Sequence, residues 1–253
     1  SDPNPLDPNR DIVLVTRWVR TDESASFTQQ QLKQFREAQR QNIINNSVLY
    51  NSLLQNPEAT PNISAKVWNS IARNDNVSSV FQAPDAIHFF GGSENMRSHM
   101  MQIAFKIDPD FSNLAAEFSY IIQTIYEFAK KRKFPFNQFL HIRIIKSSEA
   151  LLSNTFDHDP ETLYCQIDFV TNLGTSGWEE FAQLMAQRYF DKYKAKPHWG
   201  KQWEIIPNVQ SYLSGVLSDQ IKQFEKVRAK HDPDKIFFDN KSLQDIFSLA
   251  LSS

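Results

Sequence analysis

Alternating side chains in two short segments constrain the fold of this chain most strongly. In the segment 138–146, Leu140, Ile142 and Ile144 are apolar, and His141 and Arg143 fall between them. Residues 163–171 alternate in the same way. Because successive side chains of a β-strand point to opposite faces, both segments predict strands with one apolar face and one polar face.

Pairing of these two strands would bring four polar side chains onto one surface. His141 and Arg143 come from the first strand, and Gln166 and Asp168 come from the second. The opposite, apolar surface would then be covered by helices. Spacing alone slightly favours a plainer alternative, in which the polar face simply meets water, as half of many antiparallel sheets does.

The rest of the chain predicts an α+β fold, namely a mainly antiparallel β-sheet with helices covering one face. The clearest helix has an apolar stripe at helical spacing and ends before Pro135. Helices are expected at 27–54 with a Thr28 cap, at 64–73, 110–133, 177–194 and 209–230, and in a short segment at the C-terminus. Further strands are expected at 11–20, 85–90, 100–107 and 203–206.

Charge and composition exclude several classes of function. The net charge of −2 and the pI near 6.3 give no electrostatic basis for binding nucleic acid. The dense basic run Lys130–Lys133 is typical of the last turn of a helix, where cations meet the negative end of the dipole. No apolar run is long enough to span a membrane and the chain begins with no signal peptide, so we expect a soluble protein of unknown location.

Metal, thiol and phosphate chemistry also lack support in the sequence. The single cysteine, Cys165, lies in a predicted strand and is expected to be a buried, inert thiol. His158, His198 and His231 show no metal-ligand spacing. Six glycines in the whole chain leave no glycine-rich cradle, so the chain alone is not expected to hold a dinucleotide in the usual way.

Two motifs near the C-terminus resemble a known family. The run Lys196–Lys201 (KPHWGK), followed by the run 232–240 (DPDKIFFDN), resembles the C-terminal signature of vanillyl-alcohol-oxidase-type FAD oxidases. That group includes aldonolactone oxidases, alditol oxidases and the type II, covalently flavinylated cholesterol oxidases. The run Phe134–Asn137 (FPFN), which leads into the strand of His141 and Arg143, is similar to the approach to a Glu-x-Arg strand in the type II cholesterol oxidases.

The resemblance implies roles for five residues. Arg143 corresponds to an active-site arginine above the flavin, and His141 stands where the family has glutamate. Asp168 stands where the cholesterol oxidases have asparagine, Lys201 is implied to lie near N1 and the C2 carbonyl of the flavin, and His198 is implied to lie beside the site. Neutral imidazole can accept a hydroxyl proton, so His141 is a candidate base, with Asp168 as the other candidate.

By this resemblance, residues 11–253 form the substrate-binding, or cap, domain of a two-domain flavoprotein, with a helical insertion at about residues 27–75. Residues 1–10 would be a linker from a missing FAD-binding domain, which would hold most of the FAD and be the partner of this domain. The implied reaction is hydride transfer from a secondary alcohol to the flavin. A sterol or another bulky apolar alcohol is the expected substrate.

A second hypothesis is that the chain is a non-catalytic module derived from such a domain, which binds a lipid, a sterol or another protein. The replacement of the family glutamate by His141 keeps this alternative open. A flavin-binding domain in the same polypeptide would support the enzyme, whereas its absence from the natural gene would support the module.

Overall fold

The structure is a computed structural model that describes residues 21–24, 27–72, 97–138 and 140–252. These residues form two compact units. The first contains the described residues up to Ser98 with Thr124–Gln138 and Asn172–Ser176, and the second contains His99–Gln123, Phe139–Thr171 and Gly177–Ser253, each within the described part. The predicted strands at 11–20 and 85–90 and the predicted linker at 1–10 lie outside the described residues.

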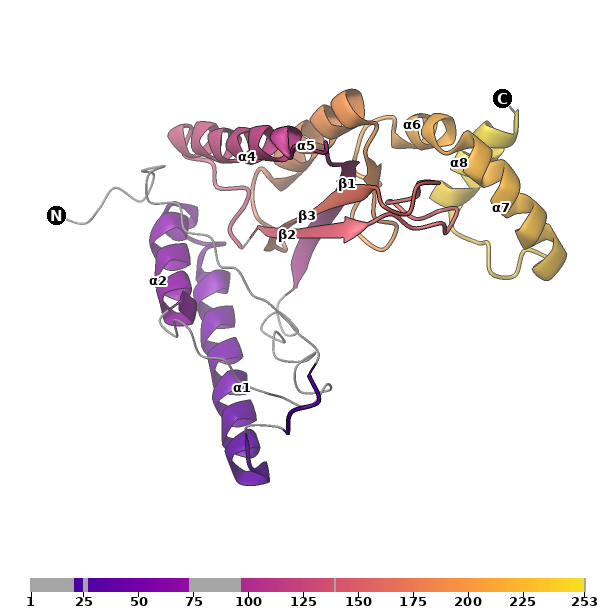
Figure 1. The fold of residues 1–253 in the computed structure, drawn as a ribbon. Coiled ribbons are helices and arrows are strands. Elements are labelled where there is room, and N and C mark those ends of the chain that lie inside the picture. Colours follow the sequence, from indigo (N-terminus) through magenta and orange to yellow (C-terminus); the bar gives the residue numbers. More distant parts are fainter. Residues whose placement is uncertain (1–20, 25–26, 73–96, 139, 253) are drawn as a thin grey trace. The chain divides into compact units, whose positions relative to one another are not determined.

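The first unit is built largely from helices (Figure 1). It contains α1 (Gln29–Ser52), a short 3-10 turn (Pro57–Ala59) and α2 (Thr60–Ala72). The predicted cap is confirmed, because Thr28 Oγ1 accepts a hydrogen bond from the Gln31 backbone N–H at 3.3 Å, and the Gln31 side chain accepts one from the Thr28 N–H. Helix α2 begins four residues earlier than predicted. Pro61 fits its first turn because backbone N–H groups there have no partner within the helix, so the N–H that proline lacks is not needed.

A four-stranded sheet forms the centre of the second unit (Figure 1). Its strands are β1 (Ser98–Lys106), β2 (His141–Lys146), β3 (Leu163–Asn172) and β4 (Lys196–Pro197), arranged in the order β2-β3-β1-β4. Strands β2 and β3 are antiparallel, as are β1 and β4. The predicted α+β class is therefore confirmed, and the two alternating strands do pair, which is the condition for their polar residues to share one surface.

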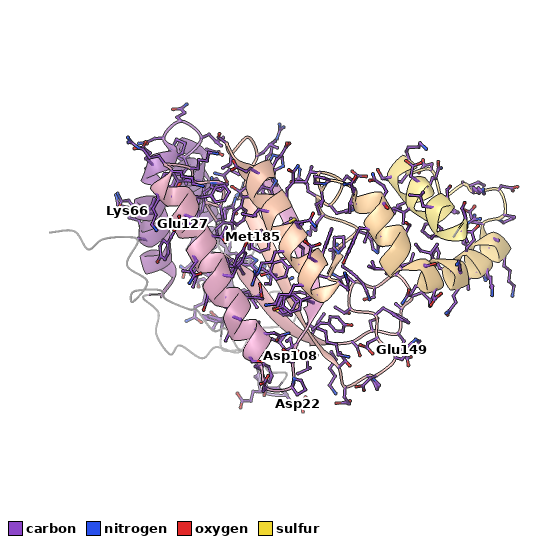
Figure 2. The ribbon with its side chains drawn as sticks, turned by 90° about the horizontal axis from the view of Figure 1, so that it is seen from above. Asp22, Lys66, Asp108, Glu127, Glu149 and Met185 are labelled. Atoms are coloured by element: carbon purple, nitrogen blue, oxygen red, sulfur yellow. The ribbon has the colours of Figure 1, made fainter. Side chains whose placement is uncertain are left out.

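Two helices cover the apolar face of the sheet, α4 (Ser112–Lys130) and α5 (Trp178–Tyr193). Figure 2 looks down on these helices, which lie side by side, with Met185 of α5 labelled. Aromatic rings join helix to strand, since Phe105 stacks on Tyr189 with centroids 5.3 Å apart and Phe169 meets Phe181 edge to face at 5.7 Å. The covering layer stops short of the edge strand β2, where Ile144 remains 50% exposed.

A buried carboxylate joins α4 to α5. Glu117 is fully buried, and its oxygens accept hydrogen bonds from Arg188, Lys192 and the Tyr193 hydroxyl at 2.6 to 2.8 Å. Burial raises the pKa of Glu117, but these donors outweigh burial and hold the pKa below its ordinary value of 4.5. The ionised carboxylate is therefore a structural part of the helical layer.

The C-terminal segment departs from two predictions. The expected strand at 203–206 is wrong, because these residues turn, with the Ile206 N–H bonded to the Trp203 carbonyl and the Ile205 carbonyl taken by the Gln183 side chain. The expected single helix at 209–230 is two helices, α6 (Val209–Val216) and α7 (Ser218–His231), which meet at the non-helical Leu217. Helix α8 (Lys241–Ser252) packs beside them (Figure 1).

Two other expectations concern the basic run and the cysteine. Lys130 is the last residue of α4, and the rest of the run forms its C-terminal cap, where Arg132 adopts a left-handed conformation with φ of 58°. Cys165 is buried, and burial raises the pKa of its thiol to about 12, as expected of an inert thiol. None of the described helices combines the length and the apolar character that crossing a bilayer requires.

Replacing Glu117 by glutamine should destabilise the protein by about 2 kcal/mol at pH 7, because Arg188 and Lys192 lose their countercharge but keep partial access to water. The folded pKa lies below the unfolded one, so this contribution is present above about pH 4.5 and is lost as the pH falls through the folded pKa. Denaturant unfolding of both proteins at pH 7 and at a pH below the folded pKa of Glu117 measures this contribution to the free energy of unfolding. Glu127→Gln, which breaks an exposed pair on the same helix, should change stability by less than about 0.5 kcal/mol.

Candidate active site

The register of the sheet lines up one polar residue from each strand. His141 of β2 lies opposite Asp168 of β3. The bond from the Ile107 N–H to the Leu163 carbonyl places Gln102 of β1 opposite Asp168, and the β1–β4 register places His198, one residue beyond β4, opposite Gln102. We call these four residues the polar row. With strands about 4.8 Å apart, it spans roughly 14 Å across the face not covered by helices.

Asp168 is the buried centre of the row, with only 2% of its side chain exposed. Arg143 reaches it diagonally from β2, and its Nη1 lies 2.9 Å from Asp168 Oδ2. From the other side, Gln102 Nε2 donates to Asp168 Oδ1 at 2.5 Å. Both carboxylate oxygens are thus occupied by donors from the two neighbouring strands, which fixes the orientation of the carboxylate.

Arg143 and His141 are exposed to solvent, unlike Asp168. The Arg143 side chain is 53% exposed, so most of its five donors are available to another molecule. Desolvation lowers the pKa of His141, the Asp168 charge opposes this, and the Arg143 charge lowers the pKa further, so the net value is below the ordinary 6.5. At neutral pH the imidazole is therefore uncharged and able to accept a proton.

The turn at residues 198–202, here called the Lys201 turn, is attached to β1 by backbone hydrogen bonds. The His198 N–H donates to the Gln102 carbonyl at 3.0 Å, and the Gln202 N–H donates to the Met100 carbonyl at 2.8 Å. Within the turn, the Lys201 N–H donates to the His198 carbonyl at 3.0 Å. The turn follows β4 directly and begins at His198, so it starts at the β4 end of the polar row.

Side chains in the Lys201 turn have unequal freedom. The Gly200 N–H donates to His198 Nδ1, and a Cβ at Gly200 would lie 3.2 Å from the imidazole, so glycine permits this close approach. The Lys201 ammonium makes no hydrogen bond or ion pair with any residue that the structure describes. This half-exposed cation can therefore meet a negative charge from outside the described chain.

Both tryptophans of the motif have packing roles. The Trp199 indole N–H donates to the Leu152 carbonyl at 2.6 Å, and the Trp203 indole N–H donates to the Trp199 carbonyl at 3.0 Å. Their rings meet edge to face with centroids 5.5 Å apart. The pair ties the Lys201 turn to the loop between β2 and β3, which supports the turn opposite its attachment to β1.

The structure brings four of the five predicted site residues together and adds one that the sequence did not reveal. His141, Arg143 and Asp168 form a cluster, and His198 completes the row, while no contact among the described residues joins Lys201 to Arg143. Gln102 is the addition. Its signal was a lone amide within the apolar strand predicted at 100–107, where an unpaired polar side chain would be costly.

The architecture defines the class of the protein. A solved structure described as cholesterol oxidase from B. sterolicum matches with a TM-score of 0.50 and 16% sequence identity, over 59% of this chain and 34% of that chain. The chain thus spans about a third of the length of that oxidase. At this identity the match shows a shared fold, an α+β domain like that in cholesterol oxidase.

The sequence places the chain more narrowly. The profile of the D-arabinono-1,4-lactone oxidase family matches residues 7–245. The chain therefore belongs to this family, and family and fold together make it an FAD-linked, oxidase-type domain. No curated protein sequence matches it at a significant level.

Two cationic side chains of this region keep donors available for a ligand. Lys201 supplies a cation without an internal partner, and Arg143 keeps free donors above a carboxylate that holds it in place. Among the described residues, no three His, Cys, Asp or Glu side chains gather as a metal site. A cation without an internal partner and a guanidinium with free donors are groups that stabilise negative charge on a ligand.

The pKa of His141, followed by NMR titration of its ring protons, should lie below 6.5. Asp168→Asn should lower it further by removing a negative neighbour, and Arg143→Met should raise it by removing a positive one. His158 provides an internal reference on the same protein, because it lies outside the polar row. A His141 pKa that is unchanged in both variants would contradict the electrostatic description of the row.

Proposed function

We propose that this chain is the substrate-binding domain of an FAD-dependent alcohol oxidoreductase, in which hydride passes from a CH–OH carbon to the flavin. The observation that carries the proposal is the Arg143–Asp168 pair, in which buried Asp168 holds a half-exposed guanidinium on the same sheet face as the polar row. Membership of the D-arabinono-1,4-lactone oxidase family supports the same reaction class.

In this proposal, His141 is the base that removes the hydroxyl proton. Its lowered pKa keeps the imidazole neutral at pH 7, and its place at the exposed end of the row leaves it open to a substrate. Asp168, the other candidate base, has both oxygens occupied by Arg143 and Gln102. We therefore assign Asp168 to orienting Arg143, while the Arg143 guanidinium binds the substrate oxygen as it becomes a carbonyl.

Lys201 and His198 are the residues of this chain proposed to face the cofactor. FAD, held mainly by a domain outside this chain, would supply the hydride acceptor. A fixed ammonium at Lys201 would balance the negative charge that accompanies reduction, and this balance lowers the barrier most when the cation is already in place. The bonds from the Lys201 turn to β1 hold the backbone from which this side chain extends.

The polar row favours a hydroxylated alcohol over the sterol expected from the sequence resemblance. The exposed side chains on this face, Arg143, His141 and His198, offer donors and acceptors, and an apolar ring placed against them would leave these groups unpaired. The family takes its name from a lactone that carries hydroxyl groups, whereas the structural relative is named for cholesterol. A sterol remains the second candidate, supported by that likeness of fold.

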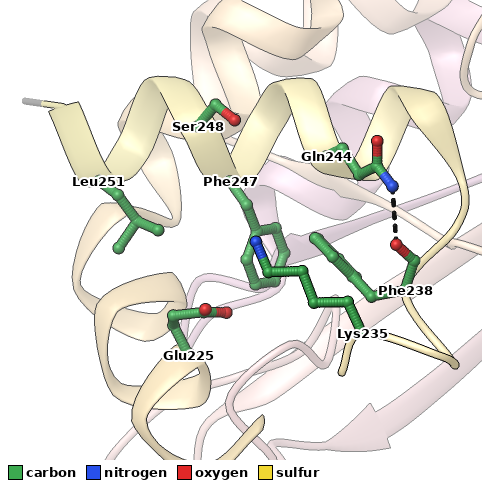
Figure 3. Close-up of a pocket in the computed structure, with 7 residues that line it drawn as sticks. All are labelled: Glu225, Lys235, Phe238, Gln244, Phe247, Ser248 and Leu251. Carbon is green, nitrogen blue, oxygen red and sulfur yellow. Dashed lines mark hydrogen bonds between the residues drawn. The ribbon is translucent and has the colours of Figure 1, made fainter. Parts of the chain in front are cut away.

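A cavity elsewhere does not change this assignment. Helices α7 and α8 enclose a hollow of about 350 Å³ (Figure 3), in which Lys235 and Glu225 face the rings of Phe238 and Phe247. It contains no residue of the polar row. Glu225 is already bonded to Arg228, so the hollow lacks a free carboxylate as well as the row's imidazole and guanidinium. We therefore place the reaction at the sheet face.

Flavin reduction in the full-length protein tests the proposal. A panel of hydroxylated lactones, polyols and sterols would be mixed anaerobically with the oxidised protein, and bleaching of the flavin absorbance would be recorded. Arg143→Ala and Lys201→Ala should each slow reduction by about 100-fold or more, since each removes a charge aimed at the reacting atoms. Lys146→Ala, which removes a cation from the opposite face of β2, is the matched control and should leave the rate within about twofold.

Reduction at wild-type rates in both Arg143→Ala and Lys201→Ala would refute these roles. If no compound of the panel reduces the flavin, the alternative of a non-catalytic module that binds a lipid, a sterol or a protein would be favoured.

The pH dependence of flavin reduction should identify the base. If His141 removes the proton, the rate should hold from neutral pH to below pH 6.5 and then fall as the imidazole becomes protonated. His141→Asn should reduce the rate and abolish this acidic limb. An acidic limb that persists unchanged in His141→Asn would assign the base to another group.

A further inference from the structure

Gln102 is a polar side chain in an otherwise apolar, buried stretch of β1. It is 4% exposed, and its neighbours Met101, Ile103 and Ala104 are at most 1% exposed. Burying an amide is unfavourable unless its hydrogen-bonding groups are satisfied. An apolar side chain of the same length would fill the space without this cost, so the amide needs a reason beyond packing.

One end of the amide is bonded and the other is not. Nε2 donates to Asp168 Oδ1 at 2.5 Å, whereas Oε1 is enclosed and has no hydrogen-bond partner among the residues described. An enclosed acceptor without a partner costs about 1–3 kcal/mol. Reversing the amide would turn its oxygen toward the carboxylate and repel it. The fold therefore retains an unpaired acceptor while it keeps a donor on Asp168.

The same residue also holds the Lys201 turn. The Gln102 carbonyl accepts the His198 N–H at 3.0 Å, and the His198 carbonyl accepts the Lys201 N–H at 3.0 Å. A continuous series of hydrogen bonds thus runs from Arg143 through Asp168 and Gln102 to Lys201. Gln102 joins its two halves, with the side chain bound to the carboxylate and the backbone bound to the turn.

We propose that Gln102 is a positioning residue, which fixes Asp168 between two donors and thereby sets the direction of the Arg143 guanidinium relative to the Lys201 turn. Arg143 is held to Asp168 through a single oxygen, so rotation of the carboxylate would swing the guanidinium. The donor from Gln102 to the other oxygen prevents that rotation. This inference rests on the proposed function for its catalytic consequence, but not for the coupling itself.

The chain offers a matched control in Gln166. This glutamine projects from β3 on the same face as Asp168, opposite Arg143 in the register, and is half-buried. Its amide donates to Asn154 Oδ1 at 3.2 Å, away from the carboxylate. Gln102→Met and Gln166→Met each replace an amide by an unbranched side chain of similar length, and only the first removes a donor from Asp168.

The test uses the full-length protein and a double-mutant cycle with Asp168→Asn. The first readout is the NMR pKa of His141 in the resting protein. Gln102→Met should raise it by a few tenths of a unit, because a donor that offsets the Asp168 charge is lost, and should leave it unchanged in the Asp168→Asn background. The second readout is flavin reduction, which should slow by about 10- to 100-fold in Gln102→Met, with the loss in rate and not in affinity.

Gln166→Met should change the rate of flavin reduction by less than about twofold. It should leave the pKa of His141 unchanged within the error of the titration. Equal effects of Gln102→Met with and without Asp168 would overturn the proposal, as would equal effects of the two methionine substitutions. If Gln102→Met does not fold, Gln102→Asn, which keeps an amide but withdraws it from Asp168 by one methylene, answers the same question. A coupled shift in the His141 pKa in a protein that no alcohol reduces would support the coupling and reject the catalytic role.

Discussion

A carboxylate with 2% exposure must find its donors inside the protein, and this constraint organises the polar face of the sheet. Asp168 takes one donor from Arg143 on β2 and one from Gln102 on β1. Both neighbours of β3 must therefore be in register for the charge to be satisfied. The arrangement links the edge strand, the central strands and, through the Gln102 backbone, the Lys201 turn.

The opposite face supplies rigidity through different chemistry. There the strands meet α4 and α5 through stacked aromatic rings, and a second buried carboxylate, Glu117, fastens the two helices to each other. Polar groups on this side are internal to the layer, whereas Arg143, His141 and Lys201 on the other side keep donors, an acceptor or a charge available. The sheet thus separates the residues that stabilise the fold from those proposed to act on a ligand.

Much of this arrangement could be predicted from local patterns. Period-two alternation placed His141 with Arg143 and Gln166 with Asp168, whereas the pairing of β2 with β3, which joins the two sets, was only a supposition until the structure showed it. The helix cap at Thr28 and the helix predicted at 110–133, which is α4, also follow from local patterns. The roles of Arg143, His141, Asp168, His198 and Lys201 rest on resemblance and stay predictions, because no contact within the chain identifies a catalytic function.

Other features depend on tertiary contacts that a local pattern does not contain. The apolar residues near Trp203 suggested a strand, but their backbone groups bond elsewhere: the Ile206 N–H donates to the Trp203 carbonyl, and the Gln183 side chain donates to the Ile205 carbonyl. The predicted helix at 209–230 is interrupted at Leu217, which is buried and has the non-helical angles φ −113° and ψ 12°. Gln102 was overlooked because its partner lies 66 residues away in sequence.

The polar row also has a consequence for how such domains diversify. Its buried members, Asp168 and Gln102, depend on each other, whereas His141 and His198 are exposed at its two ends. The backbone bonds that set the register do not depend on the side chains at these two ends, so evolution can exchange them while the buried pair and the aromatic layer stay intact. A histidine at position 141 in place of a carboxylate would then be a change of reagent within a conserved frame, so that one architecture can serve chemically distinct alcohols.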